Sequence, residues 1–177
     1  MNPFLLGLHS AAGTLGLAVL DVETGEIRDR SWQLDRQMVE QLHPCLQDFL
    51  PPEQWSTLVG VAVAVGPGSF TSCRLGVTVA RTLGQTFDIS VFGVSSLAAI
   101  AYAVLSRPDC DAAQIAVQMD AKRGEWYGGI FERVGERLKA IESDRLWTEW
   151  EWRDRISGVQ LVDAEQFETS PPTVAMT

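Results

Sequence analysis

An apolar, valine-rich stretch that runs directly into a glycine-rich loop places the strongest limit on how this chain can fold. Residues 58–65 read LVGVAVAV, and residues 66–76 read GPGSFTSCRLG. A short apolar run without alternation is typical of a strand that is covered on both faces of a sheet. Helical spacing of apolar residues then predicts a helix over about 71–86. The two stretches together predict a strand–turn–helix unit of an α/β fold.

The glycine-rich loop could hold a phosphate, carry a nucleophile or only turn the chain. A P-loop requires a lysine after its last glycine, and this loop contains none. A nucleophile elbow requires G-x-S-x-G, but Pro67 and Thr71 flank Ser69 at the glycine positions. An anion site at a helix N-terminus and a sharp turn with a hydroxyl cap both fit the residues. We favour a structural turn made by Gly66, Pro67, Gly68, Ser69, Phe70 and Thr71.

The residues before this unit predict a meander of three antiparallel strands followed by a helix. Short runs at 4–9, 15–20 and 26–32 are separated by turn residues. Apolar residues at helical spacing predict a helix over 37–50. Pro44 lies inside this pattern, and we expect a kink or a late helix start there, because proline removes a backbone donor and clashes with the preceding turn.

The residues after the predicted 71–86 helix continue the alternation of strand and helix. Residues 89–92 predict another short buried strand, and a third helix is predicted to begin at Ser95 and to end near Pro108. A meander followed by alternating strands and helices is typical of a ribonuclease H-like lobe. We therefore assign residues 1–108 to a first ribonuclease H-like lobe.

A second, shortened lobe is predicted over residues 109–177. Runs at 114–120, 125–132 and 138–141 again predict a meander, and the spacing of its glycines weakly repeats that of the first lobe. Beyond these runs the repeat is lost. Residues 169–177 have no packing pattern, and we expect them to form a C-terminal tail.

One helix can still be predicted in the later part of this lobe. Thr148 and Glu151 have the spacing of a capping box, which predicts a short helix to about Ile156. Three tryptophans beside it are expected to be core or lobe-interface aromatics, with a ligand cage or a partner anchor as the alternative. They are Trp147, Trp150 and Trp152.

Composition argues against several classes of protein. The 177 residues carry a formal net charge of −9, so we expect that the protein does not bind RNA directly. Three widely spaced cysteines and the two histidines, His9 and His43, suggest neither a disulfide framework nor a metal site. No apolar run reaches the roughly 18 residues that a membrane span needs, and the N-terminus does not resemble a signal peptide. We expect a cytoplasmic protein without a metal, a cofactor or membrane contact.

The helix predicted after the loop has small residues at every fourth position. Gly76, Ala80 and Gly84 form a smooth stripe, although glycine inside a helix costs about 1 kcal/mol relative to alanine. Close packing of another element against the stripe would offset this cost. The packing element is predicted to be either the 37–50 helix or a second protein.

Several long motifs, in order, resemble the TsaB (YeaZ) family of tRNA threonylcarbamoyladenosine biosynthesis proteins. The stretch GPGSFTSCRLGVTVARTLG with VFGVSSLAAIA after it is similar to the family's signature, and LLGLHSAAGTLGLAVLD is similar to its first hairpin. VQMDAKRGEWYGGIFE resembles the start of its second lobe. The resemblance covers roughly residues 4–132 and implies a two-lobed, actin-like ATPase fold that is not itself catalytic.

The resemblance also implies partners. TsaB-like subunits pair with the related catalytic subunit TsaD, and with the ATPase TsaE, to install threonylcarbamoyl on an adenosine beside the tRNA anticodon. TsaD holds the metal, and the TsaB-like subunit supports and activates it. Contact with tRNA is expected only through the complex, and no cofactor is expected.

In this family the helices of the first lobe form the contact with the catalytic subunit, and the same surface can form homodimers. These helices correspond to residues 38–50 and 71–86 of this chain. Helical periodicity predicts which residues of these helices face outward. The candidate partner-binding residues are Met38, Leu42, Cys45, Arg74, Val77, Thr78 and Arg81.

Two positions depart from the family's pattern. Relatives often have Asp at the end of the first strand, where actin-like enzymes organise magnesium and nucleotide, and this chain has His9. Asp120 occupies the corresponding place in the second lobe. Met38 stands where relatives often have a histidine. The alternative hypothesis, an independent actin-like nucleotide hydrolase or peptidase, depends on the glycine-rich loop and Asp120.

Overall fold

The chain divides into two compact units, Met1–Val94 and Ser95–Thr177. The computed structural model describes residues 2–168. The predicted tail over 169–177 lies outside the described residues. Each unit contains one β-sheet and its own hydrophobic core, and no described helix has the length and hydropathy that a bilayer crossing requires.

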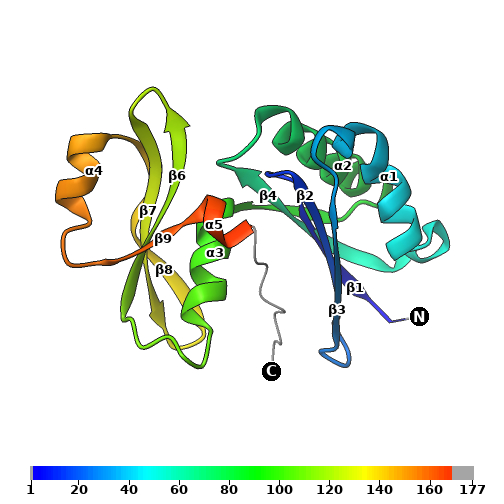
Figure 1. Ribbon diagram of the computed structural model, residues 1–177. Coiled ribbons are helices and arrows are strands. Elements are labelled where there is room, and N and C mark those ends of the chain that lie inside the picture. Colours follow the sequence, from blue (N-terminus) through cyan, green and yellow to red (C-terminus); the bar gives the residue numbers. More distant parts are fainter. Residues whose placement is uncertain (1, 169–177) are drawn as a thin grey trace. The chain divides into compact units, whose positions relative to one another are not determined.

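The first unit is built on a five-stranded sheet with the order β3-β2-β1-β4-β5 (Figure 1). Its strands are β1 (Phe4–His9), β2 (Thr14–Asp21), β3 (Ile27–Gln33), β4 (Leu58–Gly66) and β5 (Ser90–Ser95). β1 pairs antiparallel with β2 and parallel with β4, and β2 pairs antiparallel with β3. The predicted meander and the valine-rich strand are therefore confirmed.

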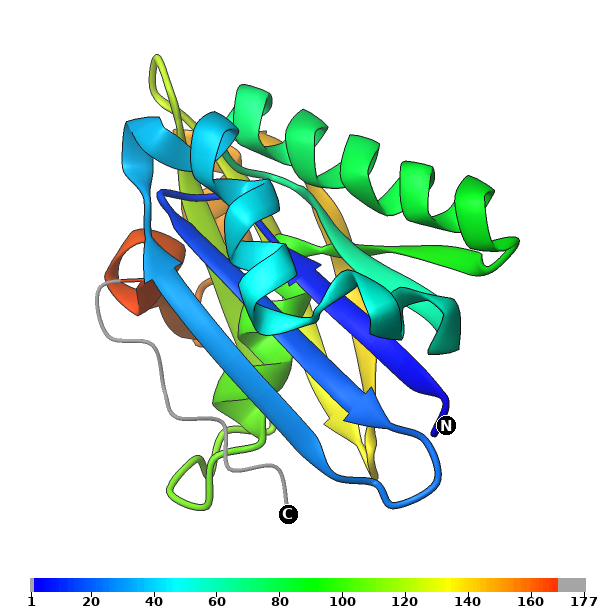
Figure 2. The same cartoon turned by 90° about the vertical axis from the view of Figure 1, so that its right-hand side faces the viewer.

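Helices α1 (Met38–Phe49) and α2 (Phe70–Phe87) share one core with this sheet, and Figure 2 shows α1 crossing in front of its strands. Two short 3-10 turns, Asp35–Gln37 and Pro52–Thr57, flank α1. Leu42 of α1, Leu83 of α2 and Val61 of β4 all belong to the core. Both helices therefore have one apolar side on the sheet and one outer side.

Pro44 lies inside α1 without delaying its start. The helix begins at Met38, so the predicted late start is wrong. The amide that proline lacks would have bonded to the carbonyl one turn earlier, at Glu40. Pro44 and Glu40 are both exposed, and a carbonyl on an exposed side can hydrogen-bond to solvent instead.

β5 is exposed, which corrects the prediction of a short buried strand over 89–92. It lies at the edge of the sheet, and every residue from Ser90 to Val94 is exposed. Val59 and Val65 of β4 are also about half exposed, so β4 is only partly covered. An apolar run alone does not distinguish a central strand from an edge strand.

The second unit is built on a four-stranded sheet with the order β8-β7-β6-β9. Its strands are β6 (Gln114–Lys122), β7 (Glu125–Val134), β8 (Arg137–Thr148) and β9 (Gln160–Asp163). Its helices are α3 (Ser96–Leu105), α4 (Glu149–Arg155) and α5 (Ala164–Glu168). The predicted second meander is confirmed.

Helix α3 belongs to the second unit, although it lies within residues 1–108, which the sequence assigns to the first lobe. Leu97 and Ile100 of α3 share a buried cluster with Ile115 and Phe131 of the second sheet. The helix is apolar on most of its surface, so its pattern does not reveal which sheet it covers. The side chain of Ser95 caps it by accepting a hydrogen bond from the Ala98 amide.

The first four strands of the first sheet are connected in the same way as the four described strands of the second sheet. In each, three antiparallel strands are followed by a helix and then by a strand that pairs parallel with the first, β4 beside β1 and β9 beside β6. This agreement supports the internal repeat suggested by the glycine spacing. β9 was not predicted, because its four residues are too few to show a period.

The predicted capping box and two of the three tryptophans are confirmed. The Thr148 hydroxyl accepts from the Glu151 amide, and the Glu151 carboxylate accepts from the Thr148 amide. Trp147 and Trp152 are buried together in the second unit. Trp150 is 77% exposed, so the expectation of a packed side chain is wrong for this residue.

Candidate functional site

The glycine-rich loop is held against the connection between β1 and β2. The Ser69 amide donates to the Ala11 carbonyl at 2.6 Å. A Cβ atom on Gly68 would overlap that same carbonyl oxygen, and Gly66 has a φ of 108° before a cis peptide bond to Pro67. The close backbone approach that glycine permits is therefore used for the chain's own turn.

These contacts favour the structural turn over the anion site. Ser69 is the N-cap residue of α2, but its side chain makes no cap hydrogen bond, contrary to expectation. Its amide, which an anion site at a helix N-terminus would use, already donates to Ala11. Phe70 is 75% exposed, with the Arg74 guanidinium carbon 5.1 Å from its ring centre. The loop therefore positions α2 and leaves an aromatic ring on the surface.

The small-residue stripe of α2 packs on the sheet of its own unit. A Cβ on Gly76 would overlap the Ser10 hydroxyl, and a Cβ on Gly84 would lie 2.5 Å from Val91 of β5. Ala80 is fully buried. The stripe therefore faces neither α1 nor a second protein, and both sequence-based alternatives for its packing partner are wrong.

Two of the predicted partner-binding residues do not face outward. Met38 and Leu42 are buried in the core of the first unit, together with Leu46 of the same helix. Helical periodicity correctly places Met38 and Leu42 on one side of α1. In the structure, that side faces the sheet rather than a partner. Cys45 is half-buried beside this core, and burial raises the pKa of its thiol.

Three of the four remaining candidates, Arg74, Thr78 and Arg81, are exposed on the outer side of α2. Val77 is half-buried and packs against the core of the first unit. On α1 the exposed apolar side chain is Val39, at 59%. Val39 is not among the candidates from the sequence, because helical spacing alone does not show which apolar side chains of α1 face away from the sheet. We call the exposed sides of α1 and α2 the outer helix surface.

At the end of β1, His9 takes the place of the carboxylate expected from the actin-like pattern. Burial lowers the pKa of its imidazole, and a hydrogen bond with the Thr14 backbone opposes this effect. The ring is therefore neutral at pH 7 and brings no negative charge to this position. Within residues 2–168, no three or more His, Cys, Asp or Glu side chains are grouped as metal ligands.

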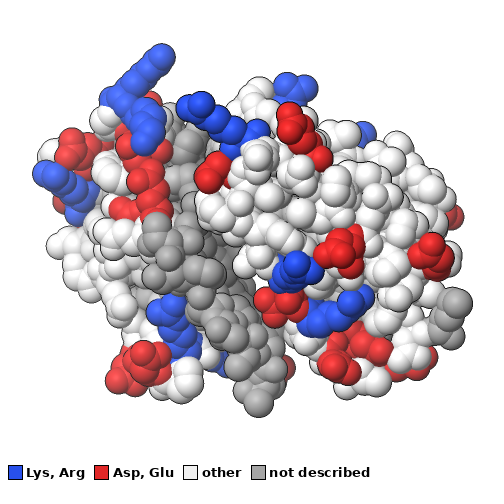
Figure 3. All heavy atoms as spheres, turned by 45° about the vertical axis from the view of Figure 1, so that its right-hand side comes forward, with Lys and Arg blue, Asp and Glu red and all other residues white. Residues whose placement is uncertain are grey.

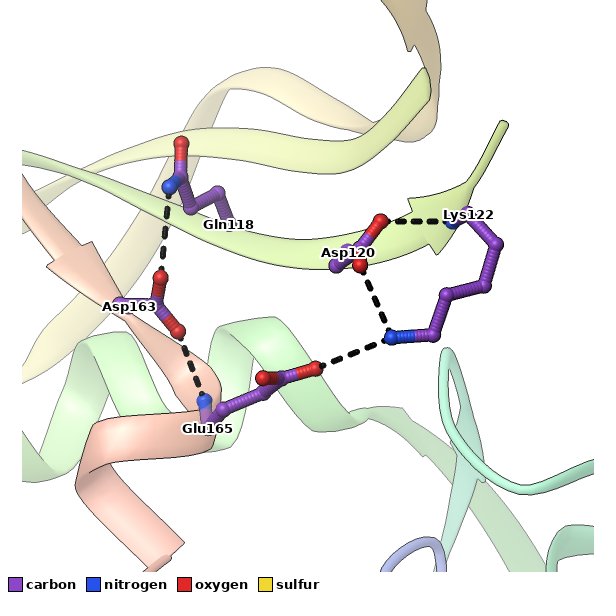
Figure 4. A network of polar contacts seen from close by, with 5 residues as sticks. All are labelled: Gln118, Asp120, Lys122, Asp163 and Glu165. Carbon is purple, nitrogen blue, oxygen red and sulfur yellow. Dashed lines mark hydrogen bonds and ion pairs between the residues drawn. The ribbon is translucent and has the colours of Figure 1, made fainter. Parts of the chain in front are cut away.

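In the second unit, Asp120 belongs to a network of polar contacts (Figure 4). Its carboxylate accepts from the Lys122 ammonium at 2.8 Å and from the Lys122 amide at 2.7 Å. These bonds lower the pKa of Asp120. The ammonium also lies 3.8 Å from Glu165. A lysine therefore occupies the space beside the carboxylate that the alternative hypothesis invokes.

Asp163 and Gln118 complete the network in Figure 4. Asp163 accepts from the Glu165 amide at 2.9 Å and from the Gln118 side chain at 3.4 Å. Gln118 also accepts from the buried Trp152 indole at 2.8 Å. These bonds connect β6, β9 and α5, so the network has a structural role within the second unit.

The charged residues do not form a basic area on the face drawn in Figure 3. Lys and Arg side chains are intermixed there with Asp and Glu. Together with the net charge of −9, this mixed distribution of charges differs from that of proteins that bind nucleic acid through a basic face.

Comparison with known proteins identifies related chains. Residues 33–148 match the family model described as TsaD: tRNA N6-adenosine threonylcarbamoyltransferase. The tRNA threonylcarbamoyladenosine biosynthesis protein TsaB of Bacillus subtilis is 31% identical over 80% of this chain and 60% of its own length. The protein of the same name from Escherichia coli is 25% identical over 73% of this chain and 67% of its own length. The chain thus spans about 60% of the length of the first of these relatives.

Solved structures give the fold. YeaZ from Pseudomonas aeruginosa aligns with a TM-score of 0.74 at 21% identity, covering 94% of this chain and 89% of its own. A second structure, described as an uncharacterized protein with similarity to peptidase YEAZ from the same organism, gives 0.76 with the same identity and coverage. The fold is the predicted actin-like, ribonuclease H-like α/β fold, with a smaller sheet in the second unit.

Proposed function

The chain belongs to the TsaB (YeaZ) branch of the tRNA N6-adenosine threonylcarbamoyltransferase family, and from this premise we propose that it is a non-catalytic subunit. In this role it binds and activates a TsaD-like catalytic subunit, which forms threonylcarbamoyladenosine next to the anticodon of tRNAs. The outer helix surface on α1 and α2 is the proposed contact with that subunit.

The observation that carries this proposal is the outer side of α2. Its inner side is fully used by its own sheet at Gly76, Ala80 and Gly84. Its outer side presents Arg74, Thr78 and Arg81, and α1 presents the exposed Val39. The matched region, 33–148, contains both helices. Arginine with apolar side chains around it is typical of the parts of an interface that contribute most to affinity.

A supporting role, rather than a catalytic one, agrees with the local chemistry. The glycine-rich loop is packed against Ala11, and His9 replaces a carboxylate at the end of β1. His9 lies on β1 and His43 on α1, so they are not the helical pair, four residues apart, that a catalytic sibling uses for its metal.

The wider complex follows from the same proposal. A TsaE-like ATPase would join the two subunits, and tRNA would contact this chain only within the complex, in the cytoplasm. A homodimer through the outer helix surface would compete with the heterodimer, because both would cover the same side chains of α1 and α2.

Reconstitution tests the proposal. The purified chain is mixed with the TsaD counterpart encoded in the same genome, and the mixture is analysed by size-exclusion chromatography with light scattering. A one-to-one heterodimer is expected, and adding the TsaE counterpart, ATP and the other substrates should restore tRNA modification. Separate elution of the two intact subunits at micromolar concentration would contradict the proposal.

The alternative, an independent nucleotide hydrolase or peptidase, has less support. The two features that motivated it are a loop packed on its own chain and a carboxylate paired with Lys122. Calorimetry with ATP and magnesium discriminates between the functions. Turnover by the isolated chain would favour the alternative.

A further inference from the structure

We propose that Arg74 and Arg81 form an arginine pair on α2 that recognises two carboxylates on a helix of the partner subunit. This inference rests on the proposed function, and it adds the chemistry of the partner. The partner helix would present Asp or Glu side chains about two turns apart. The recognition element would be the charge of the two guanidinium groups rather than the apolar area alone.

The helix geometry places the two arginines on one face. They are seven residues apart, which is about two turns and roughly 10 Å along the axis. Both are exposed. Helix α2 contains no Asp or Glu over Phe70–Phe87, so neither charge is neutralised by a neighbour one turn away. The contact of Arg74 that the structure shows is with the Phe70 ring.

The surface between the arginines has few polar groups that require solvent. The Thr78 hydroxyl donates to the Arg74 carbonyl at 2.7 Å, and the Thr82 hydroxyl donates to the Thr78 carbonyl at 2.9 Å. Because these hydroxyls are bonded to the helix backbone, covering the two threonine side chains costs little desolvation. A carboxylate that reaches either arginine across a dry strip is attracted more strongly than in water.

The neighbouring helix has the opposite charge. Within Met38–Phe49 the charged residues are Glu40 and Asp48, with no Lys or Arg, and Asp48 is paired with Arg30 at 2.8 Å. The two helices of the outer helix surface therefore differ in sign. An acidic partner helix is attracted by α2 and repelled by Glu40 of α1, so the charges select which partner helix lies on α2.

A protein helix fits this strip better than a phosphate backbone does. The first unit is acidic overall, and a nucleic acid needs several cations along its path. The two arginines of α2, with Glu40 as an exposed acidic residue on α1, provide too little positive charge for that. The proposal therefore commits to an acidic helix of the TsaD-like subunit.

Charge reversal tests the proposal. The variant carries Arg74→Glu and Arg81→Glu, and the control carries Arg137→Glu, which removes one exposed arginine on the second unit. Binding to the purified TsaD counterpart is measured by surface plasmon resonance at about 50 mM and about 500 mM NaCl, which change the screening length severalfold. The double variant should bind at least about tenfold more weakly at low salt. That difference should shrink at high salt, and the control should stay within about twofold of wild type.

The outcomes separate this inference from the proposed function. If wild type itself does not bind the TsaD counterpart, the proposed function fails, and this inference fails with it. If wild type binds but the double variant binds equally well with the same salt dependence, only the arginine pair is wrong. If the double variant forms the heterodimer normally but the complex loses affinity for tRNA, the arginines contact phosphate and the inference is overturned. Unfolding curves show whether the charge-reversal variant is folded. If it is not, a second variant with Arg74→Gln and Arg81→Gln is tested in the same binding experiment, and the same outcomes apply.

Discussion

Gly76 of α2 and Ser10, which follows β1, lie so close together that a methyl group on Gly76 would overlap the Ser10 hydroxyl oxygen. Ser10 is fully buried, and its hydroxyl donates to the Ser72 carbonyl at 2.8 Å. Since Ser72 lies one turn before Gly76, the hydrogen bond and the close approach hold the same part of the helix against the sheet. This contact fixes the helix that carries the proposed binding surface.

Replacing Gly76 by alanine should therefore destabilise the protein. Helix propensity alone would favour alanine by about 1 kcal/mol, but the added methyl must displace Ser10 or Leu8 in a packed core, which typically costs about 1–3 kcal/mol. We expect a net loss of unfolding free energy in urea titrations. Thr82→Ala, on the exposed side of α2, is the control and should change stability little. A more stable Gly76→Ala protein would show that the two elements do not pack as described.

Replacing Ala80 by glutamate should unfold the first unit rather than remove only partner binding. Ala80 is fully buried against the sheet, and an unpaired buried charge costs several kcal/mol. Circular dichroism and the elution volume report the folded state. A folded Ala80→Glu monomer that fails to bind a partner would mean that the small-residue stripe faces the partner after all.

The stability of the protein should fall as pH falls through the range where histidine titrates. Burial lowers the pKa of His9 in the folded state, so the unfolded chain binds the proton more readily, and stability rises with pH. The contribution of neutral His9 to the free energy of unfolding is therefore complete above the ordinary histidine pKa of about 6.5, and it is lost as the pH falls below that value. Urea titrations across this range should show the slope for wild type and a smaller slope for His9→Asn. An equal slope in both proteins would assign the effect to other groups.

The two tryptophans of α4 should respond differently to replacement by alanine. Trp152 is buried, packs 5.4 Å from the Trp147 ring centre and donates to Gln118. Its loss should cost about 3–5 kcal/mol. Trp150 is 77% exposed, so Trp150→Ala should change stability by only about 0.5 kcal/mol. Thermal unfolding of both variants measures the difference, and similar losses would contradict the described position of α4.

Local sequence signals predicted most of the elements of this fold. The period of apolar residues located α1, α2 and α3, and the turn residues separated the strands of both meanders. The Thr148–Glu151 capping box depends on only four residues and was found at its predicted place. These features are local, so a single sequence contains enough information to predict them.

Features that depend on distant residues could not be predicted in the same way. Met38 and Leu42 form a regular stripe, but the stripe does not say whether a sheet or a partner covers it. The exposure of β5 follows from its place at the sheet edge, and α3 lies on the second sheet because Leu97 fits the cluster there. Ala11, which fills the space beside the glycine-rich loop, is far from it in sequence.

The most direct test of the proposed binding surface is a calorimetric titration of the TsaD counterpart with wild type and with a Thr78→Trp variant. Thr78 lies between Arg74 and Arg81 on the exposed side of α2, so a large ring there should block close packing of a partner without entering the core. Glu136→Trp, in the exposed β7–β8 turn, is the matched control. We predict that wild type and the control bind, and that Thr78→Trp binds at least about 100-fold more weakly, a difference of about 2.7 kcal/mol, with an unchanged unfolding midpoint. Equal binding by all three proteins would contradict the assignment of this surface.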